Sequence, residues 1–412
     1  MKLQNLLIAG CVALMPGVAG AFTLAEAGFD APEASKNDST GFVFTDIKVI
    51  PTTPVKDQNK SGTCWCFAAT SYIEDAILRN GGPEMDLSEM FWVRHAYIEK
   101  AKKYVRTQGH INFAQGGGTM DVIEMIKEFG AMPEEAYTGL NYGEKKHSHY
   151  EMYDALKGYL DGIIKGNRKH ISPSWIKGFT AILDNYLGEV PEKFTYKGKT
   201  YTPKEFAKAF GIDKIADNSI NVTSYTHHPF FTQFAIEIAD NWTWAKSYNV
   251  PLADLKTIID DCLENGYTVA WAADVSEGGF KWYEGYAILP AEQTEANMSE
   301  SELSKWTKMS DKDREAERFK KNGPQKEVEV TQELRQQEFD SFDTTDDHGM
   351  VIVGIAKDQE GNRFYKVKNS WDTNQVYDGF FYVSEPYLLS KTIFVTIDKQ
   401  ALPKDLAKKM FK

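Results

Sequence analysis

The chain is poor in cysteine, has no excess of positive charge, and lacks long apolar runs beyond its N-terminus. Only four of its 412 residues are cysteine, and 47 Lys and Arg stand against 59 Asp and Glu. Because proteins hold phosphate backbones mainly through Lys and Arg, the net charge of −12 does not favour a nucleic-acid partner. No run past the N-terminus approaches the roughly 20 apolar residues of a membrane span, so no transmembrane segment is expected.

The first 21 residues predict an export signal. Lys2 supplies a positive start, residues 6–18 are mostly apolar, and Ala19-Gly20-Ala21 offers the small residues that a signal peptidase needs. We therefore expect an exported protein, periplasmic or secreted. An alternative is a lipoprotein signal, in which Cys11 becomes a lipidated N-terminus. Residues 22–45 are small and polar, and they predict a linker or a short propiece.

The cysteines that remain after signal removal favour a reactive thiol over a disulfide framework. They are Cys64, Cys66 and Cys262, and three thiols cannot all pair. An exported protein of this size that relied on disulfides would commonly contain more cysteines. An odd cysteine in an exported chain is a candidate nucleophile.

The apolar periodicity changes along the chain from helical to alternating. It predicts helices at 64–79, 87–106, 119–129, 151–165 and 254–265, and strands at 268–274, 350–356, 363–369, 379–383 and 392–397. Residues 171–222 are mixed and give no clear assignment. A chain that starts helical and ends in a sheet indicates an α+β fold with two lobes and a cleft between them.

Residues 291–335 are highly charged and contain few β-branched or aromatic residues. This composition predicts a solvated helical excursion or a flexible loop. A role in gating the substrate is the alternative.

Cys64 has the sequence context of an activated thiol. It opens the helical pattern of residues 64–79 directly after a glycine-containing turn, so its sulfur is expected at the positive end of the helix dipole. That position and a nearby imidazolium both lower a thiol pKa. Cys66 lies two residues on, about 200° around the helix, and is expected to be a buried structural thiol. Cys262 falls within an apolar periodic helix and has the same expectation.

Residues 58–68, Gln-Asn-Lys-Ser-Gly-Thr-Cys-Trp-Cys-Phe-Ala, resemble the nucleophile segment of papain-like cysteine peptidases. The resemblance implies that Cys64 is the nucleophile. It also implies that the Gln58 side chain and the Cys64 backbone N–H form the oxyanion hole, whose donors stabilise charge on the attacked carbonyl oxygen.

Two segments near the strand-rich end extend the resemblance. His348 opens a predicted strand, and Lys368-Asn369-Ser370-Trp371 is similar to the Asn-Ser-Trp segment of the family. The resemblance implies that His348 is the general base and acid, that Asn369 orients it, and that Trp371 shields their hydrogen bond from water. Hairpin geometry supports the match, because a turn at 358–362 places residue 351 opposite Asn369, near His348.

No metal or organic cofactor is expected. The other histidines, including His227-His228 and the pair His147 and His149, have no comparable context. None of them shows a zinc-like ligand spacing.

Within the family, the chain resembles the bleomycin hydrolase and bacterial aminopeptidase C branch. In papain the histidine follows the nucleophile by about 130 to 150 residues, and here the separation is roughly twice as long, as in a scaffold with large helical insertions. We expect a papain-like peptidase domain at 46–412, with a helical N-terminal lobe and an antiparallel, barrel-like C-terminal lobe. The helical insertions are expected near 140–250 and 290–335.

A glycine run, Gly116-Gly117-Gly118, is among the stretches that match this branch. The resemblance implies that Gly117 and Gly118 bind the substrate backbone, which approaches glycine closely. A plain loop is the alternative.

The resemblance implies a peptidase that acts on peptide substrates, most simply an aminopeptidase, and a possible homo-hexamer. Two departures leave alternatives open. Asp372 replaces the glycine that follows Asn-Ser-Trp in the family, and the chain ends at Lys412, apparently before the tail that blocks the cleft in this branch. Endopeptidase activity is therefore an alternative. A catalytically inactive cleft-binding protein and a transglutaminase-like acyl transferase are further alternatives.

Overall fold

The computed structural model describes residues 41–166, 170–292 and 298–411. The predicted signal at 1–21, the alternative lipidation site at Cys11, and most of the predicted linker at 22–45 lie outside these ranges. Within them, no helix is both long enough and apolar enough to cross a membrane.

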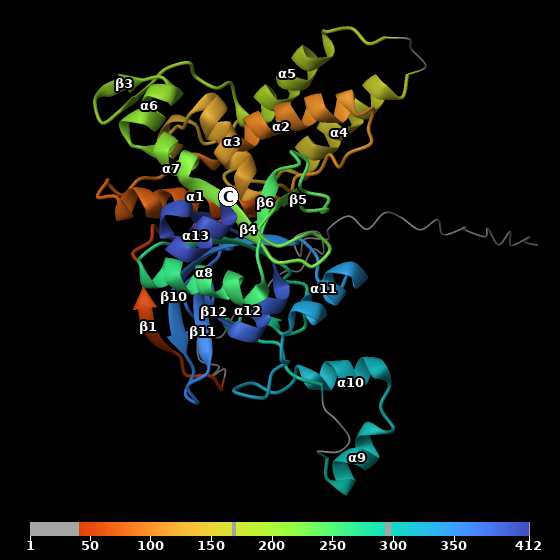
Figure 1. The fold of residues 1–412 in the computed structure, drawn as a ribbon. Helices are drawn as coiled ribbons and strands as arrows, with labels where there is room; N and C mark the ends of the chain where they lie inside the picture. The colour runs from red at the N-terminus through yellow and green to blue at the C-terminus, as the bar shows by residue number, and fades with distance from the viewer. Residues whose placement is uncertain (1–40, 167–169, 293–297, 412) are drawn as a thin grey trace, which may run out of the picture.

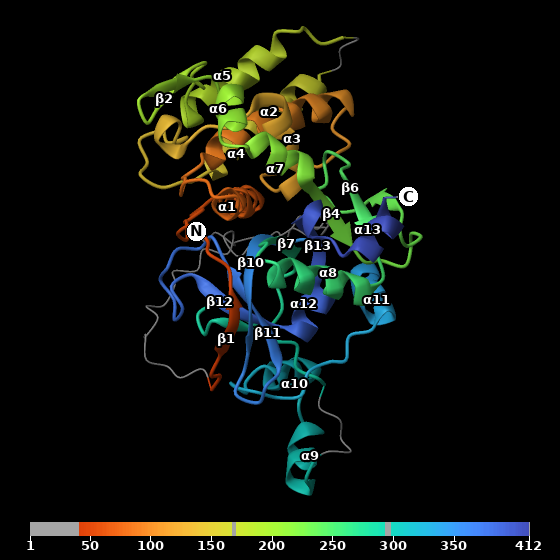
Figure 2. The ribbon, with the colours of Figure 1, turned by 60° about the vertical axis from the view of Figure 1, so that its left-hand side comes forward.

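Two lobes meet along helix α1, with helices on one side and a sheet on the other (Figures 1 and 2). The helical lobe contains a small hairpin and a short 3-10 turn besides its helices. Its elements are α1 (Cys64–Arg79), α2 (Glu89–Arg106), α3 (Thr119–Phe129), η2 (Glu134–Ala136), α4 (Tyr150–Ile164), α5 (Trp175–Leu187), β2 (Phe194–Tyr196), β3 (Lys199–Tyr201), α6 (Pro203–Ala209) and α7 (Ile212–Asn218).

The second lobe is built on one large sheet. An antiparallel sheet was expected, but the observed sheet is mixed. Its strand order is β5-β6-β4-β13-β7-β10-β11-β12-β9-β8, with β1 paired to β10, and the pairs β4–β6 and β12–β9 are parallel. The strands are β1 (Thr45–Val49), β4 (Ser219–Thr223), β5 (Gln233–Ala235), β6 (Lys246–Asn249), β7 (Val269–Ala273), β8 (Phe280–Lys281), β9 (Tyr286–Ala287), β10 (His348–Lys357), β11 (Arg363–Lys368), β12 (Phe380–Ser384) and β13 (Thr392–Asp398).

Several helices lie beside this sheet or project from it (Figure 1). They are α8 (Leu252–Glu264), α9 (Glu300–Trp306), α10 (Asp311–Arg318), α11 (Gln332–Ser341), α12 (Glu385–Lys391), η4 (Lys399–Ala401) and α13 (Lys404–Met410). The predicted α+β class is confirmed, and the predicted helices and strands are found within one or two residues of the expected bounds. The unassigned stretch 171–222 contains short elements, from α5 to β4.

Helix α1 is the element on which the two lobes converge. Its residues from Cys64 to Ile77 are all buried, so it lies inside the molecule rather than on its surface. Gly349 of β10 permits this approach: a Cβ there would lie 3.2 Å from the Trp65 Cα and 3.4 Å from the Cys64 carbonyl oxygen. A larger residue would push α1 and β10 apart and separate the residues that each contributes to the site.

The β10–β11 hairpin has the predicted turn and a shift in its pairing. From Lys357↔Arg363 to Gly354↔Lys366 the register is the expected one. A β-bulge between Ile352 and Gly354 then moves the pairing by one residue, so that Val351 faces Lys368 instead of Asn369. A bulge bends its strand and re-aims the side chains beyond it. Here the shift brings Asn369 one position closer to His348 than the turn alone predicts.

The charged stretch at 291–335 leaves the sheet and returns to it. Helices α9 and α10 project away from both lobes (Figures 1 and 2). The excursion is closed at its base, where Pro290 bridges Glu327 and the Ala291 N–H donates to the Lys326 carbonyl at 2.9 Å. Within the described part of this stretch, the chain is helical at α9 and α10.

Candidate active site

Cys64 is the first residue of α1 and is buried next to β10. The backbone N–H of Gly349, the residue directly after His348, hydrogen-bonds its sulfur. The sequence-predicted nucleophile and base, which are far apart along the chain, therefore lie on two elements in direct contact. The first N–H groups of a helix have no partner within it, so α1 also presents its open donors at this point.

His348 and Asn369 are joined by a short hydrogen bond of 2.7 Å between Nε2 and Oδ1. The same Oδ1 accepts the backbone N–H of Ser370 at 2.7 Å, which identifies it as the oxygen of the amide. In the neutral ring His348 therefore carries its hydrogen on Nε2 and donates it to Asn369. The other nitrogen, Nδ1, is then the basic one.

Trp371 covers the imidazole. The ring centroids of Trp371 and His348 are 4.4 Å apart, at an interplanar angle of 32°. Phe280 and Trp282 pack edge-on against the indole at 6.0 and 5.4 Å and hold it in place. The indole therefore limits the access of water to this side of the imidazole.

Gln58 is buried and its amide is fixed from both ends. Its Oε1 accepts the Ser370 hydroxyl at 2.7 Å, and its Nε2 donates to the Ser61 carbonyl at 2.8 Å. The Gln58 N–H also donates to the Ser370 carbonyl at 2.9 Å, which ties this segment to the one that carries Asn369. An amide nitrogen has two hydrogens, so one remains for a further acceptor.

Burial opposes charge on both members of the Cys64–His348 pair. It raises the pKa of Cys64 to about 12, against the lowering effect of the Gly349 N–H, and nearby Asp346 and Asp240 raise it further. Burial also lowers the pKa of His348 to about 4, against the raising effect of Asn369. Desolvation therefore favours the neutral forms of both side chains, which is opposite in direction to the low thiol pKa that the helix N-terminus predicts.

The glycine run lies against the nucleophile turn. The Gly62 N–H donates to the Gln115 side chain at 2.8 Å, and the Trp65 indole N–H donates to the Gln115 carbonyl at 3.0 Å. At Gly117 a Cβ would lie 3.1 Å from the Trp65 ring and 2.6 Å from an Asp121 oxygen. Gly117 and Gly118 also line a pocket.

Acidic side chains share this pocket, and the sequence patterns did not reveal them. Asp346 lies two residues before His348, and Asp240 and Asp121 come from other segments, yet all three line the pocket with Gly117 and Gly118. We call it the acidic pocket. Sequence spacing could not identify the group, because three separate segments supply it.

The three aspartates differ in their partners. Asp121 accepts bonds from the Gly118 N–H, the Trp242 indole and the Thr243 hydroxyl, and Asp240 accepts one from Asn112. No hydrogen bond or ion pair to the Asp346 side chain occurs within the described ranges. Burial, followed by repulsion from Asp240 and Asp347, holds the pKa of Asp346 well above its usual range.

The other two cysteines lie in the core, as predicted. Cys66 is fully buried, and its thiol donates to the Glu89 carbonyl at 3.3 Å. Cys262 is fully buried in α8. Burial raises the pKa of both thiols, so neither is set up as a nucleophile.

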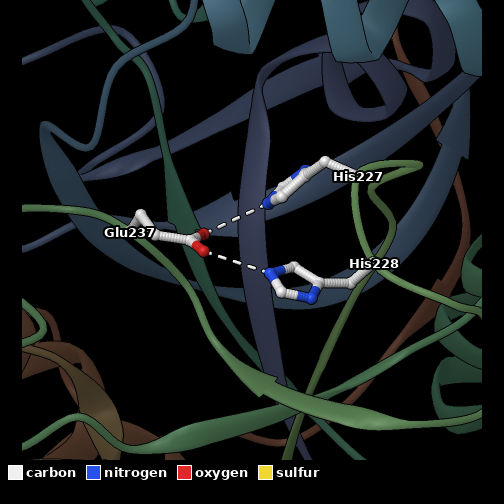
Figure 3. Close-up of side chains that lie close together, drawn as sticks. All are labelled: His227, His228 and Glu237. Carbon is white, nitrogen blue, oxygen red and sulfur yellow. Dashed lines mark hydrogen bonds and ion pairs between the residues drawn. The ribbon is translucent and has the colours of Figure 1, made fainter.

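Away from Cys64, the structure gathers a set of side chains of the kind that bind metals. One ligand atom from each of His227, His228 and Glu237 lies within 4.8 Å of the others, and the two rings face the two carboxylate oxygens of Glu237 (Figure 3). The spacing of the histidines along the chain did not predict this. Neighbouring residues of a regular strand point to opposite faces, but this pair lies in a turn that leaves both rings on one side.

The comparisons with known proteins agree with this geometry. Residues 44–177 match the family model described as papain family cysteine protease, and residues 324–412 match that of the Peptidase C1-like family. The chain is a cysteine peptidase that contains segments of the papain type. The two matched segments contain the four residues Gln58, Cys64, His348 and Asn369.

Full-length relatives of this peptidase are distant but cover most of the chain. Aminopeptidase C of Lactobacillus delbrueckii subsp. lactis is 21% identical over 404 residues, which cover 87% of this chain and 82% of the relative. Cysteine proteinase 1, mitochondrial, of Saccharomyces cerevisiae is 22% identical over 414 residues, covering 89% and 79%. Aminopeptidase G of Lactobacillus delbrueckii subsp. lactis is 23% identical over 422 residues, covering 90% and 87%. The predicted resemblance to the aminopeptidase C branch is confirmed.

A solved structure shares the fold. PepW from Lactobacillus rhamnosis superposes with a TM-score of 0.64 at 18% identity, over 89% of this chain and 84% of PepW. The papain-like fold is therefore shared across most of both chains.

Proposed function

We propose that the peptidase cleaves through Cys64, His348 and Asn369 and acts as an aminopeptidase. The observation that carries the proposal is the joint position of the α1 N-terminus, the hydrogen-bonded His348–Asn369 pair and the fixed Gln58 amide. These groups supply a nucleophile, a base with its orienting partner, and oxyanion donors.

In the proposed cycle, the Nδ1 of His348 accepts the thiol proton as Cys64 attacks the substrate carbonyl. Because the two side chains are neutral beforehand, this one transfer creates the thiolate and the imidazolium together, each stabilising the other. The Cys64 N–H and the free Gln58 N–H stabilise the oxyanion. His348 then protonates the leaving amine, and water, deprotonated by His348, releases the acyl group from Cys64.

The aminopeptidase mode is supported by the names of two relatives and by the acidic pocket. Aminopeptidases must recognise a free α-ammonium group near the scissile bond. Asp346 and Asp240 lie close enough to Cys64 to raise its pKa, and a bound cation would offset their mutual repulsion. Gly117 and Gly118, on the same pocket, leave room for the substrate backbone.

The nucleophile is tested with Cys64→Ala and a matched control, Cys66→Ala, two residues along the same helix. Cys64→Ala should abolish peptide hydrolysis and labelling by an epoxysuccinyl thiol-protease inhibitor. Cys66→Ala should retain both. Hydrolysis by the Cys64→Ala variant would refute the assignment, and a wild-type protein that neither cleaves nor labels would indicate an inactive binding protein.

The cleavage mode is tested with one peptide in two forms, with a free and with an acetylated N-terminus. The aminopeptidase proposal expects cleavage of the free form only, whereas internal cleavage of both forms indicates an endopeptidase. Asp346→Asn should lower kcat/KM for the free form about tenfold or more by removing a charge–charge contact. An unchanged kcat/KM would assign amine recognition to other groups.

Export through residues 1–21 and assembly into a homo-hexamer remain predictions from the sequence. N-terminal sequencing of the mature protein, and its mass in solution, would test them.

A further inference from the structure

We propose that His227, His228 and Glu237 form a binding site for a divalent transition metal of the zinc class. The proposal is independent of the catalytic assignment, because none of the three residues belongs to the active site. Two features carry it: the convergence of the three ligand atoms, and the packing that fixes both rings.

The ligand atoms have the spacing of a metal site. The Nε2 of His227 lies 3.1 Å from one carboxylate oxygen of Glu237, and the Nε2 of His228 lies 3.1 Å from the other (Figure 3). Zinc bonds to nitrogen and oxygen are about 2.0 to 2.2 Å long, so tetrahedral ligands lie roughly 3.3 Å apart. Each imidazole nitrogen is already near this distance from a carboxylate oxygen, and one atom from each residue lies within 4.8 Å of the others.

The donor types suit zinc, nickel or copper better than calcium or magnesium. Two imidazole nitrogens and one carboxylate oxygen are a donor set found in zinc sites, and imidazole is a poor ligand for the hard alkaline-earth ions. The three side chains are 29%, 35% and 59% exposed, so an ion can enter and water can fill a fourth position.

The histidine rings are held before any ion binds. His228 stacks on Phe234 at 4.1 Å and 22°, and Phe234 also packs edge-on against His227 at 5.3 Å. The Nδ1 of His227 lies 3.1 Å from the Gln336 Nε2 and 3.3 Å from the Gln336 Oε1, and the Thr226 N–H holds that oxygen at 2.6 Å. The Gln336 amide can therefore donate to Nδ1 when no ion is bound, or accept from Nδ1–H when Nε2 binds a metal.

Metal binding replaces hydrogen bonds in this group. Without an ion, a neutral histidine with its hydrogen on Nε2 donates it to Glu237. On binding, that hydrogen moves to Nδ1 by exchange with water, and the freed Nε2 lone pair bonds the metal. On His227 the new Nδ1–H donates to the Gln336 Oε1, 3.3 Å away, whereas without an ion Nδ1 accepts from the Gln336 Nε2 at 3.1 Å. The carboxylate supplies the third bond.

The site would also brace the acidic pocket. Glu237 lies between Ile236 and Ile238, both of which line that pocket. An ion at the three residues would tie this wall to the turn at 226–228.

The test measures Zn²⁺ binding to the full-length Cys64→Ala protein, in which the active-site thiol cannot compete for the metal. Calorimetry should show one ion per chain. Glu237→Gln, which keeps the shape of the side chain, and His228→Ala should each weaken binding at least tenfold. The matched control, His110→Ala, changes an exposed histidine outside the group and should bind as the parent does.

Co²⁺ provides a second readout that does not depend on affinity alone. A tetrahedral site with two histidines should give visible absorption bands that Glu237→Gln alters and His110→Ala preserves. The proposal fails if the parent binds no stoichiometric ion, or if affinity and spectrum are the same in all variants. The latter result would leave the three residues as an ordinary hydrogen-bonded cluster.

Discussion

At the scale of single residues, the Asn369 amide controls which nitrogen of His348 is basic. Asn369→Ala removes the acceptor for Nε2–H, so the ring loses both its orientation and its preference for one tautomer. A hydrogen bond to a charged group is worth about 1.5 to 3 kcal/mol, so kcat/KM should fall about 10- to 100-fold. Thr373→Ala, on an exposed residue of the same loop, is the control. Equal kcat/KM in the two variants would remove Asn369 from the mechanism.

The opposed pKa shifts of Cys64 and His348 give a prediction about pH. With the thiol pKa raised to about 12 and the imidazole pKa lowered to about 4, alkylation at pH 7 depends on proton transfer between them. His348→Gln removes the acceptor, so iodoacetamide labelling of Cys64 at pH 7 should slow at least tenfold. In this variant the rate should climb with pH through the alkaline range, because only free thiolate reacts. Superimposable pH profiles for wild type and variant would contradict the prediction.

At the scale of elements, a buried ionic network fixes the segment that carries Gln58. The Lys56 ammonium pairs with Glu74 of α1 at 3.0 Å and with Glu89 of α2 at 2.7 Å. The Thr53 hydroxyl donates to Glu74 at 2.7 Å. The residues ahead of the nucleophile are therefore tied to two helices, and the position of Gln58 depends on contacts away from the site.

Lys56→Met should destabilise the protein strongly. It leaves the buried carboxylates of Glu74 and Glu89 without their cation, a change that typically costs about 3 to 5 kcal/mol. Burial already raises the pKa of Glu89 to about 7 despite Lys56, and losing Lys56 raises it further. A raised acid pKa favours the protonated folded form, so stability falls as pH rises from the unfolded value of about 4.3. Urea unfolding should therefore show a larger loss at pH 8 than at pH 5.

The control for this measurement is Lys127→Met. Lys127 forms an exposed pair with Glu124 on α3, and such pairs contribute at most about 0.5 kcal/mol. A similar loss in both variants, or a Lys56→Met loss that is independent of pH, would rule out the buried network as the cause.

The elements that the sequence predicted best are those bounded by clear turn or helix-stop residues. Helix α1 lies between a glycine-containing turn and Gly81-Gly82-Pro83, and both of its ends were correct. The hairpin register was correct near its turn, but the bulge between Ile352 and Gly354 was not foreseen, because turn length alone fixes only a regular ladder. Residues 171–222 contain α5, several short elements and the start of β4. The short elements β2, β3, α6 and α7 depend on packing in the core of the helical lobe, so their local patterns were weak.

The residues of the site also fall into those that the sequence could identify and those that it could not. Residues in contiguous motifs, such as Cys64 and Asn369, were identified from sequence, and the structure brings their segments together. The acidic pocket and the metal-binding group were not, because each joins segments separated along the chain. The direction of the Cys64 pKa shift was also missed, since it depends on burial, which the motif does not specify.

At the scale of the whole molecule, the projecting helices α9 and α10 can be separated from the peptidase core. Ala291 and Lys326 meet at the base of the excursion, and the Arg318 side chain donates to the Pro290 carbonyl at 2.7 Å. Phe319 packs where Gly278 and Gly279 leave space, so the inner end of the excursion belongs to the core. The outer part, up to residue 317, can therefore be removed without disturbing these contacts.

Replacing residues 292–317 with a short Gly-Ser linker should leave catalysis intact. The linker keeps Arg318, Phe319 and the contacts at the base, and loop length by itself costs little free energy. We expect kcat/KM for a short peptide within about twofold of wild type, and a thermal unfolding midpoint within a few degrees. Cleavage of a protein substrate distinguishes a solvated excursion at 291–335 from one that gates the substrate. If the stretch is only a solvated excursion, the shortened peptidase should cleave the protein substrate and the peptide at wild-type rates. If the stretch gates the substrate, the ratio of these two rates should differ between the shortened peptidase and the wild type.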